Sequence, residues 1–213
     1  MSVQESWPAP MSSGAARAQR PSRRSGLRRA EIIRAATAVF GERGYANGSL
    51  NEIAARVGMT HAGVLHHFGS KEQLLIAVLE YRDDADVAEL EGHHAPRDAT
   101  LLDHLVATAQ LNSERRGIVQ GYTVLLGESV TEDNPARAFF TDRYSGLRGM
   151  ISTAVAEATG RAPGDAEVST AASVLIATMD GLQTQWLLDP TSVDMTTALR
   201  LAVDAIIARL GAV

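Results

Sequence analysis

The stretch of residues 49–73 constrains the fold more than any other part of this chain, because it encodes two short helices joined by a glycine turn. It reads S-L-N-E-I-A-A-R-V-G-M-T-H-A-G-V-L-H-H-F-G-S-K-E-Q. Ser49 and Glu52 have the spacing of a capping box, which predicts the start of the first helix. Gly58 is expected to end that helix, since glycine tolerates the positive φ of a tight exit. Thr60 then stands where a cap of the second helix is required.

Further helices are predicted on both sides of this pair. Apolar residues recur at helical spacing in residues 27–45, and Gly41 and Gly44 are expected to close that helix. Ser70 and Gln73 form a second capping box, which predicts a third helix downstream. Three helices in this order are typical of helix-turn-helix DNA-binding units, although any helical bundle contains capped helices and glycine turns.

These segments resemble the amino-terminal part of the TetR family of transcriptional regulators. The family pattern is I-x-x-A-A-x-x-L-F-x-x-x-G-Y, T-x-x-x-I-A-x-x-A-G-V-S and Y-x-H-F-x-S-K-E-x-L, and residues 27–75 match it nearly throughout. One position departs, because this chain has Leu65 where the family usually has a Tyr that touches the DNA backbone. The resemblance implies an all-α homodimer with an amino-terminal helix-turn-helix domain and a carboxy-terminal helical domain that binds a small-molecule effector.

The pattern divides the chain into three parts. Residues 1–25 are expected to be a disordered basic arm, residues 26–74 the helix-turn-helix DNA-binding domain, and residues 75–213 the effector-binding and dimerisation domain. The arm is either a source of phosphate or minor-groove contacts or an inert extension. It lacks the apolar core of a secretory signal, and no stretch approaches the roughly 20 apolar residues of a membrane span. We therefore expect a cytoplasmic protein without a membrane contact.

Charge is distributed unequally along the chain. Residues 1–74 carry a net charge of +5 and residues 75–213 one of −10, so positive charge is concentrated where phosphates would be met. The alternative is an ordinary solvated surface. Lys71 is the single lysine beside 19 arginines, and we expect it to contact a phosphate. Cysteine is absent, which excludes disulfides and thiolate chemistry.

The residues expected to contact double-stranded DNA lie on or beside the second helix of the pair. They are Ser49, Thr60, His61, Ala62, His66, His67 and Lys71. Thr60 and His61 are the candidates for base edges and Ala62 for a thymine methyl, while the others are better placed for phosphates. For His67 the alternative is internal packing beside Phe68. Since none of the exposed residues of that helix is Arg or Asn, base specificity does not follow from the sequence.

The remainder of the chain reads as helices alone. They are expected at residues 71–92, 101–112, 114–130, 135–158, 165–188 and 193–210. The last two carry apolar stripes at alternating spacings of about four and three, namely Val168, Ala172, Leu175, Met179, Leu182 and Trp186, then Met195, Leu199, Ala202, Ile206 and Leu210. Such stripes either close the chain's own core or pair with a second copy in a four-helix bundle. We favour the homodimer, which would also match a palindromic site.

An effector cavity is implied by the resemblance. The polar or aromatic residues on apolar helices that are candidates to line it are His104, Tyr122, Phe140, Tyr144, Met150, Met179, Gln183 and Trp186. Each of them taken singly has the alternative of ordinary core packing. Because few ionisable groups occur on these helix faces, the expected effector is apolar or mildly polar.

The sequence argues against an enzyme. His93, His94, Asp98 and His104 form a cluster of metal-ligand types, but it surrounds a Gly and Pro interruption and lacks the spacing of a helical metal site. No nucleophile elbow or phosphate-binding glycine loop is present. We expect no metal or cofactor and a regulator that represses transcription. The alternatives are an activator, an effector-independent architectural DNA-binding protein and, remotely, a helical metal-dependent enzyme.

Overall fold

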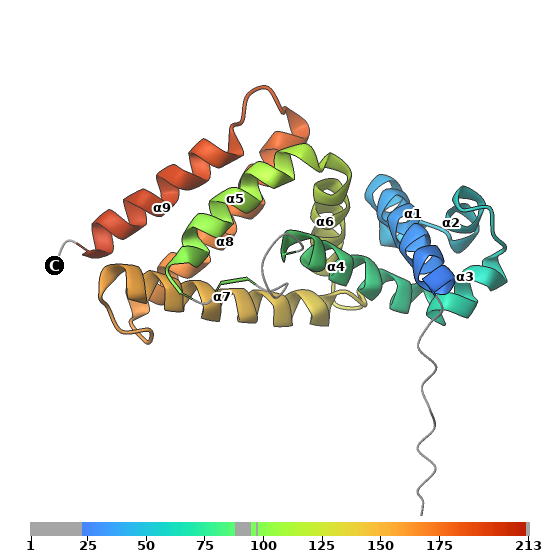
Figure 1. The fold of residues 1–213 in the computed structure, drawn as a ribbon, viewed down its shortest axis with the longest axis horizontal. Helices are drawn as coiled ribbons and strands as arrows, with labels where there is room; N and C mark the ends of the chain where they lie inside the picture. Colours follow the sequence, from blue (N-terminus) through green and yellow to red (C-terminus); the bar gives the residue numbers. More distant parts are fainter. Residues whose placement is uncertain (1–22, 88–94, 97, 212–213) are drawn as a thin grey trace, which may run out of the picture.

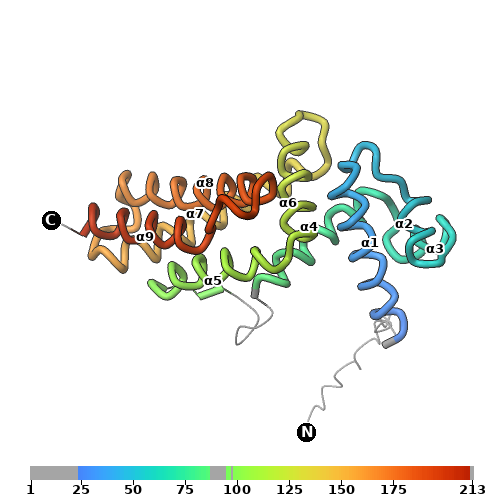
Figure 2. Tube along the Cα trace, turned by 90° about the horizontal axis from the view of Figure 1, so that it is seen from above, coloured from blue at the N-terminus to red at the C-terminus, as the bar shows by residue number. Residues whose placement is uncertain are grey.

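The computed structural model describes residues 23–87, 95–96 and 98–211, and each regular element in these ranges is an α-helix, as expected. The helices are α1 (Arg23–Asn47), α2 (Leu50–Arg56), α3 (His61–Phe68), α4 (Lys71–Val87), α5 (Thr100–Glu114), α6 (Arg116–Ser129), α7 (Arg137–Thr159), α8 (Ala166–Leu188) and α9 (Met195–Gly211). Figure 1 shows α1, α2 and α3 at one end and α9 at the other. Helices α4 and α6 lie between the two ends (Figure 2).

The predicted caps of the helix-turn-helix are present. The Ser49 Oγ accepts a hydrogen bond from the Glu52 backbone at 3.1 Å, and the Thr60 Oγ1 accepts one from the Gly63 backbone at 3.1 Å. Gly58 has φ of 63°, the left-handed conformation that the turn requires. The reciprocal half of the first capping box is absent, because the Glu52 carboxylate instead pairs with Arg56 at 3.0 Å.

Gly41 has a different role from the one predicted. It lies inside α1, which continues to Asn47, while Gly44 alone has the irregular φ of 74°. A Cβ on Gly41 would lie 3.2 Å from the Gly121 backbone of α6. The absent side chains of these two glycines therefore allow α1 and α6 to approach closely.

Several element boundaries differ from the predicted ones. Helix α1 already begins at Arg23, inside the segment assigned to the arm, and residues 1–22 lie outside the described residues. Helix α4 is described as far as Val87, so its predicted extension toward residue 92 also lies outside them. Helix α7 begins two residues later than predicted, because the Asn134 Oδ1 accepts from the Ala136 backbone at 2.9 Å in the preceding turn.

Two hydrophobic cores hold the helices together, and the boundary between them does not coincide with the predicted domain boundary at residue 74. The first contains the buried side chains of α1 to α4 and continues into the segment from α6 to α7 through Tyr122, Leu125, Ala136 and Phe140. The second is formed by α5 to α9. The unit of residues 26–74 that was predicted to bind DNA thus shares its core with α6 and the start of α7.

The apolar stripes of α8 and α9 face inward, so the intrachain interpretation is right for these residues. Val168, Ala172, Leu175 and Trp186 of α8 and Met195, Leu199 and Leu210 of α9 are buried within one chain, and Met179, Leu182, Ala202 and Ile206 pack against the same core. Assigning these stripes to a homodimer interface was wrong. Residues at a similar helical spacing also form the outer sides of these two helices. They are Thr170, Val174, Ala177, Gly181, Thr184 and Leu188 on α8 and Ala198, Leu201, Ala205 and Ala208 on α9.

Candidate nucleic-acid interface and central cavity

Helix α3 presents an open surface at the end of the molecule remote from α9 (Figure 1). Thr60, His61, Ala62 and His66 are exposed, whereas His67 is half-buried. Val64 and Phe68, on the inner side of the helix, are buried in the first core. The predicted candidates for base contacts therefore lie together on the outer side of α3.

His61 is oriented by a neighbour that sequence reasoning did not single out. Its Nδ1 lies 2.9 Å from the Asn51 Oδ1 of α2. Because an amide oxygen only accepts, Nδ1 donates in this pair, and in the neutral ring Nε2 is left as an acceptor. Such an acceptor fits the exocyclic amino group of adenine or cytosine at the edge of a base pair.

Leu65 and His67 are partly engaged in internal packing. Leu65 is half-buried and packs against the first core, so it offers no polar group where the family Tyr would stand. The His67 carbonyl accepts a hydrogen bond from Arg29 at 3.1 Å, and its ring lies 5.8 Å from that of His66. The packing alternative for His67 therefore holds for its backbone carbonyl, while part of its side chain stays accessible.

Ser49 and Lys71 are tied into the protein but keep capacity for a phosphate. The Ser49 hydroxyl accepts at its cap and can still donate. The Lys71 Nζ donates to the Ala46 carbonyl at 3.4 Å and lies 4.5 Å from the centre of the Tyr45 ring. Partial burial lowers the pKa of Lys71. Among the described residues, the Lys71 ammonium uses one of its three N–H donors in a hydrogen bond.

Two arginines of α1 join the helices of the unit and were missed as site residues. The Arg29 guanidinium lies 4.1 Å from the centre of the Phe68 ring, besides its bond to α3. Arg28 donates to the Val57 carbonyl at 3.4 Å and pairs with Glu31 at 2.6 Å. The adjacent basic pair in L-R-R-A-E was the available signal. Both side chains belong to exposed residues beside α3, where they add positive charge.

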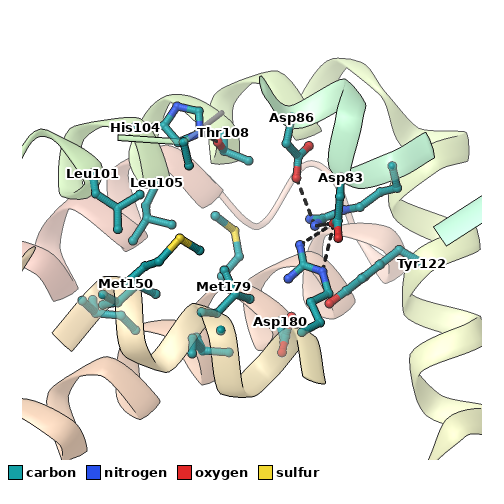
Figure 3. Close-up of a pocket in the computed structure, with 18 of the residues that line it drawn as sticks. Asp83, Asp86, Leu101, His104, Leu105, Thr108, Tyr122, Met150, Met179 and Asp180 are labelled. Atoms are coloured by element: carbon teal, nitrogen blue, oxygen red, sulfur yellow. Dashed lines mark hydrogen bonds and ion pairs between the residues drawn. The ribbon is translucent and has the colours of Figure 1, made fainter. Parts of the chain in front are cut away.

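A cavity of about 360 Å³ lies among α4 to α9. Figure 3 shows that its two ends differ. Leu101, Leu105 and Met150 lie at a mainly apolar end, with His104 and Thr108 beside them, while Asp83, Asp86, Asp180 and Tyr122 lie at a polar end. The volume falls in the range of about 300–1,000 Å³ that is usual for small-molecule sites. The separation of its lining into an apolar end and a polar end predicts a ligand with an apolar body and one polar group.

An ionic cluster at the polar end joins α4 to α7 and to Arg115, which lies between α5 and α6. The Arg82 Nη1 lies 3.2 Å from Asp83 and 3.0 Å from Asp86, whose other oxygen lies 2.6 Å from Arg115. Arg143 reaches the same Asp83 oxygen at 2.7 Å. Arg82 is 8 % exposed, and burial of so many charges requires that they satisfy one another.

Asp180 lies in the same end of the cavity without an arginine partner in the described chain. It accepts a hydrogen bond from the Tyr144 hydroxyl at 2.6 Å. Burial raises the pKa of Asp180, and the hydrogen bond from Tyr144 and the charges of Arg82 and Arg143 oppose that effect. Burial, followed by the bond to Asp180, also raises the pKa of Tyr144.

The structure brings some of the predicted effector residues to the cavity and not others. His104, Tyr122, Met150 and Met179 line it. Tyr144 is not among the lining residues and donates its hydroxyl hydrogen bond to Asp180, which is. Phe140 is buried in the first core against Tyr122, Gln183 is buried but does not line the cavity, and Trp186 packs in the second core under Arg116. These four assignments were wrong because a helical stripe does not distinguish a packed side from a hollow one.

The expectation of few ionisable groups is also wrong. Four aspartates and two arginines line the cavity among the described residues: Asp83, Asp86, Asp142, Asp180, Arg82 and Arg143. Three of them come from α4, whose helical pattern of alternating charge resembles an exposed surface in the sequence.

Helix α6 connects the cavity to the helix-turn-helix unit. Tyr122 lines the cavity, and the two residues before it contact α1: Gln120 donates to the Gly41 carbonyl at 3.1 Å, and Gly121 meets Gly41. One end of the same helix carries Glu128, which accepts from the Tyr45 backbone at 2.6 Å. A displacement of α6 by a ligand would therefore be transmitted to α1 without an intervening loop.

No group of three or more His, Cys, Asp or Glu side chains is placed to hold a metal ion in the part of the chain that the structure describes. Of the predicted cluster, His93 and His94 lie outside the described residues, Asp98 accepts from the Thr100 backbone at 3.0 Å, and His104 faces the cavity. Among the described helices, none combines the length and the apolar character needed to cross a membrane.

Comparison with known proteins decides the family. Residues 32–78 match the bacterial regulatory proteins of the tetR family, and residues 97–211 match the C-terminal part of BetI-type transcriptional repressors. The chain belongs to the TetR family. The TetR-family regulator ArpR of Pseudomonas putida is 30% identical over 193 residues, which cover 83% of this chain and 88% of ArpR. TtgR of Pseudomonas putida is 28% identical with the same coverage of both chains.

The fold is shared with solved structures as well. The SmeT–triclosan complex superposes with a TM-score of 0.68 at 24% identity, covering 86% of this chain and 91% of SmeT. The chain is accordingly a TetR-family DNA-binding transcriptional regulator, and its relatives are regulators rather than enzymes.

Proposed function

We propose that the protein is a transcriptional repressor that binds a palindromic operator as a homodimer and leaves it when a small molecule fills the cavity. The observation that carries the proposal is the continuity from the exposed α3, through the core shared with α6, to the cavity lined by Tyr122. The match of the carboxy-terminal half to a repressor family supports repression over activation.

DNA recognition is assigned to the outer side of α3. Thr60, His61 and Ala62 contact base edges, while His66 and Lys71 contact phosphates of the DNA backbone. Ser49 and His67 are supporting contacts, since each is already engaged within the protein.

The homodimer is assigned to the outer side of α8 and α9. Between Val168 and Leu188 the sole charged residue is Asp180, which faces the cavity, so the exposed side of α8 carries no charge after Glu167 in its first turn. Val174, Leu188 and Leu201 are exposed large apolar side chains on this surface. Small residues between them, such as Ala177 and Gly181, would allow close helix packing. A second copy of the same surface supplies the complementary uncharged partner.

The experiment that tests the function is selection of bound fragments from a genomic DNA pool by the purified protein. We expect a recovered palindrome whose half-sites lie about one helical turn apart, or a multiple of that distance. Similar affinity for every duplex would instead identify an architectural DNA-binding protein and overturn the proposal. A promoter fused to the recovered site then distinguishes repression from activation.

Lys71 provides a test of the phosphate contact. The variant Lys71→Met retains the apolar stem over Tyr45 but removes the charge. We expect weaker operator binding and a slope of log K against log salt that is smaller by about 1, because one fewer counterion is released. Lys71→Arg is the control and should restore both quantities. An unchanged salt slope in Lys71→Met would show that the lysine only stabilises the turn at Ala46.

Gly58 provides a test of the turn. A Cβ at this position meets nothing within 4 Å, so Gly58→Val acts through its positive φ alone, with a strain of about 1–3 kcal/mol. We expect a change in the angle between α2 and α3, at least about tenfold weaker operator binding, and an unchanged oligomer. Gly117→Val is the matched control, since Gly117 is helical and also has open space around it. Equal operator affinity in both variants would mean that the angle of the turn is not critical.

A further inference from the structure

We propose that the cavity selects a protonated amine carrying an apolar body, in preference to quaternary ammonium, neutral or anionic compounds of equal size. This inference rests on the effector role proposed above and specifies the chemistry of the molecule that fills it. At the polar end of the cavity some carboxylates have an arginine partner and others do not, and this difference determines the class of ligand.

The carboxylates of the cavity are matched unequally. Asp83 and Asp86 take up the guanidinium groups of Arg82, Arg115 and Arg143 within 3.2 Å. Asp180 has no ion pair within the described residues, and only its Oδ2 is engaged, by the Tyr144 hydroxyl.

A ligand that fills the cavity removes the remaining water from Asp180. Burial raises the pKa of this carboxylate although the hydrogen bond from Tyr144 and the charges of Arg82 and Arg143 oppose the effect, so its charge is only partly compensated. An ammonium beside Oδ1 would compensate the charge and donate a hydrogen bond to it. Asp142, at the rim of the same cavity, adds a second carboxylate of the same sign.

The aromatic geometry argues against a quaternary ammonium. Tyr122 is the aromatic ring that lines the cavity among the described residues, apart from the imidazole of His104. Its ring centre already lies 4.3 Å from the Arg82 guanidinium and 5.4 Å from that of Arg143. Because these cations interact with the ring, it is not free to form the aromatic cage by which trimethylammonium groups are bound. A quaternary nitrogen also lacks the N–H that Asp180 can accept.

An anionic ligand is disfavoured by the same contacts. The arginines that could pair with a carboxylate of the ligand already pair with Asp83 and Asp86. The apolar body itself is accommodated by Leu101, Leu105 and Met150 at the other end of the cavity (Figure 3).

The test uses five compounds with one apolar body: 4-phenylbutylamine, its N,N-dimethyl and N,N,N-trimethyl derivatives, 4-phenylbutanol and 4-phenylbutanoate. Binding to the full-length protein is measured by calorimetry near neutral pH, and operator release by fluorescence anisotropy. We expect the primary and dimethyl amines to bind at least about tenfold more tightly than the other three, as one charge-assisted hydrogen bond permits.

The variant Asp180→Asn retains an acceptor for Tyr144 and should abolish the preference, with the amine losing about tenfold in affinity and the alcohol unchanged. Asp204→Asn, an exposed change on α9, is the matched control. Equal or tighter binding of the alcohol, the carboxylate or the trimethyl compound would overturn the amine assignment while leaving the effector role intact. Binding by none of the five compounds overturns the amine assignment as well. Binding of the amines without operator release would overturn the effector role and keep the ligand class.

Discussion

Replacement of Val174 by Arg is expected to convert the protein to a folded monomer and to weaken operator binding by about 100-fold or more. Val174 is 46% exposed in the middle of the uncharged outer side of α8. In a symmetric interface the new guanidinium would be buried once from each copy, and the nearby Glu167 carboxylate already pairs with Arg161 and Arg209. Each half-site would then have to be bound independently. Light scattering coupled to gel filtration gives the mass, and anisotropy gives the operator affinity.

The matched control for this change is Val130→Arg. Val130 is 73% exposed at the end of α6, outside the proposed interface. The same substitution there should leave the mass of the dimer unchanged. A dimeric Val174→Arg protein would place the interface elsewhere on the surface. A monomer with full operator affinity would show that two-fold symmetry is not needed for DNA binding.

Replacement of Arg82 by Leu is expected to lower the free energy of unfolding by about 3–5 kcal/mol, the usual cost of removing one partner from a buried ionic cluster. Arg82 is 8% exposed, pairs with Asp83 and Asp86, and stacks on Tyr122. Its loss leaves the largely buried Asp86 with Arg115 as its remaining partner and Asp83 with Arg143. Urea unfolding followed by circular dichroism, at fixed protein concentration, measures the effect.

Arg56→Leu is the control for burial. Arg56 also contacts two carboxylates, those of Glu42 and Glu52, but a third of its side chain is exposed. Solvent screens these pairs, so the unfolding midpoint should stay close to that of the parent protein. Equal destabilisation by the two substitutions would contradict the view that burial makes the Arg82 cluster important.

The local features of the helix-turn-helix could be predicted because each depends on neighbours in sequence. Ser49 and Thr60 cap helices that begin at the next residue, and Gly58 adopts the φ that its turn requires. The helical class of the chain follows from the same kind of information. Periodicity also located the inner sides of α8 and α9, but it could not show that one chain covers them by itself.

The features that the sequence did not predict depend on residues far apart in the chain. Arg115 meets Asp86 across 29 positions, and Gly121 meets Gly41 across 80, so neither contact leaves a local pattern. Likewise, nothing near Asp180 in the sequence indicates that Tyr144 would be its partner. The polar end of the cavity arises only when α4, α6, α7 and α8 are brought together.

The core that α1 to α4 share with Tyr122, Leu125, Ala136 and Phe140 has a consequence for building hybrid sensors from this protein. A chimera joined at residue 74 would carry a helix-turn-helix unit that lacks the part of its core supplied by α6 and α7. It would therefore expose apolar surface at the junction. A chimera that also includes α6 and the beginning of α7 would keep this core complete. The unit that can be transferred between proteins is therefore discontinuous in sequence. Exchanging residues 1–74 alone should produce an aggregating chimera instead of one with a new specificity.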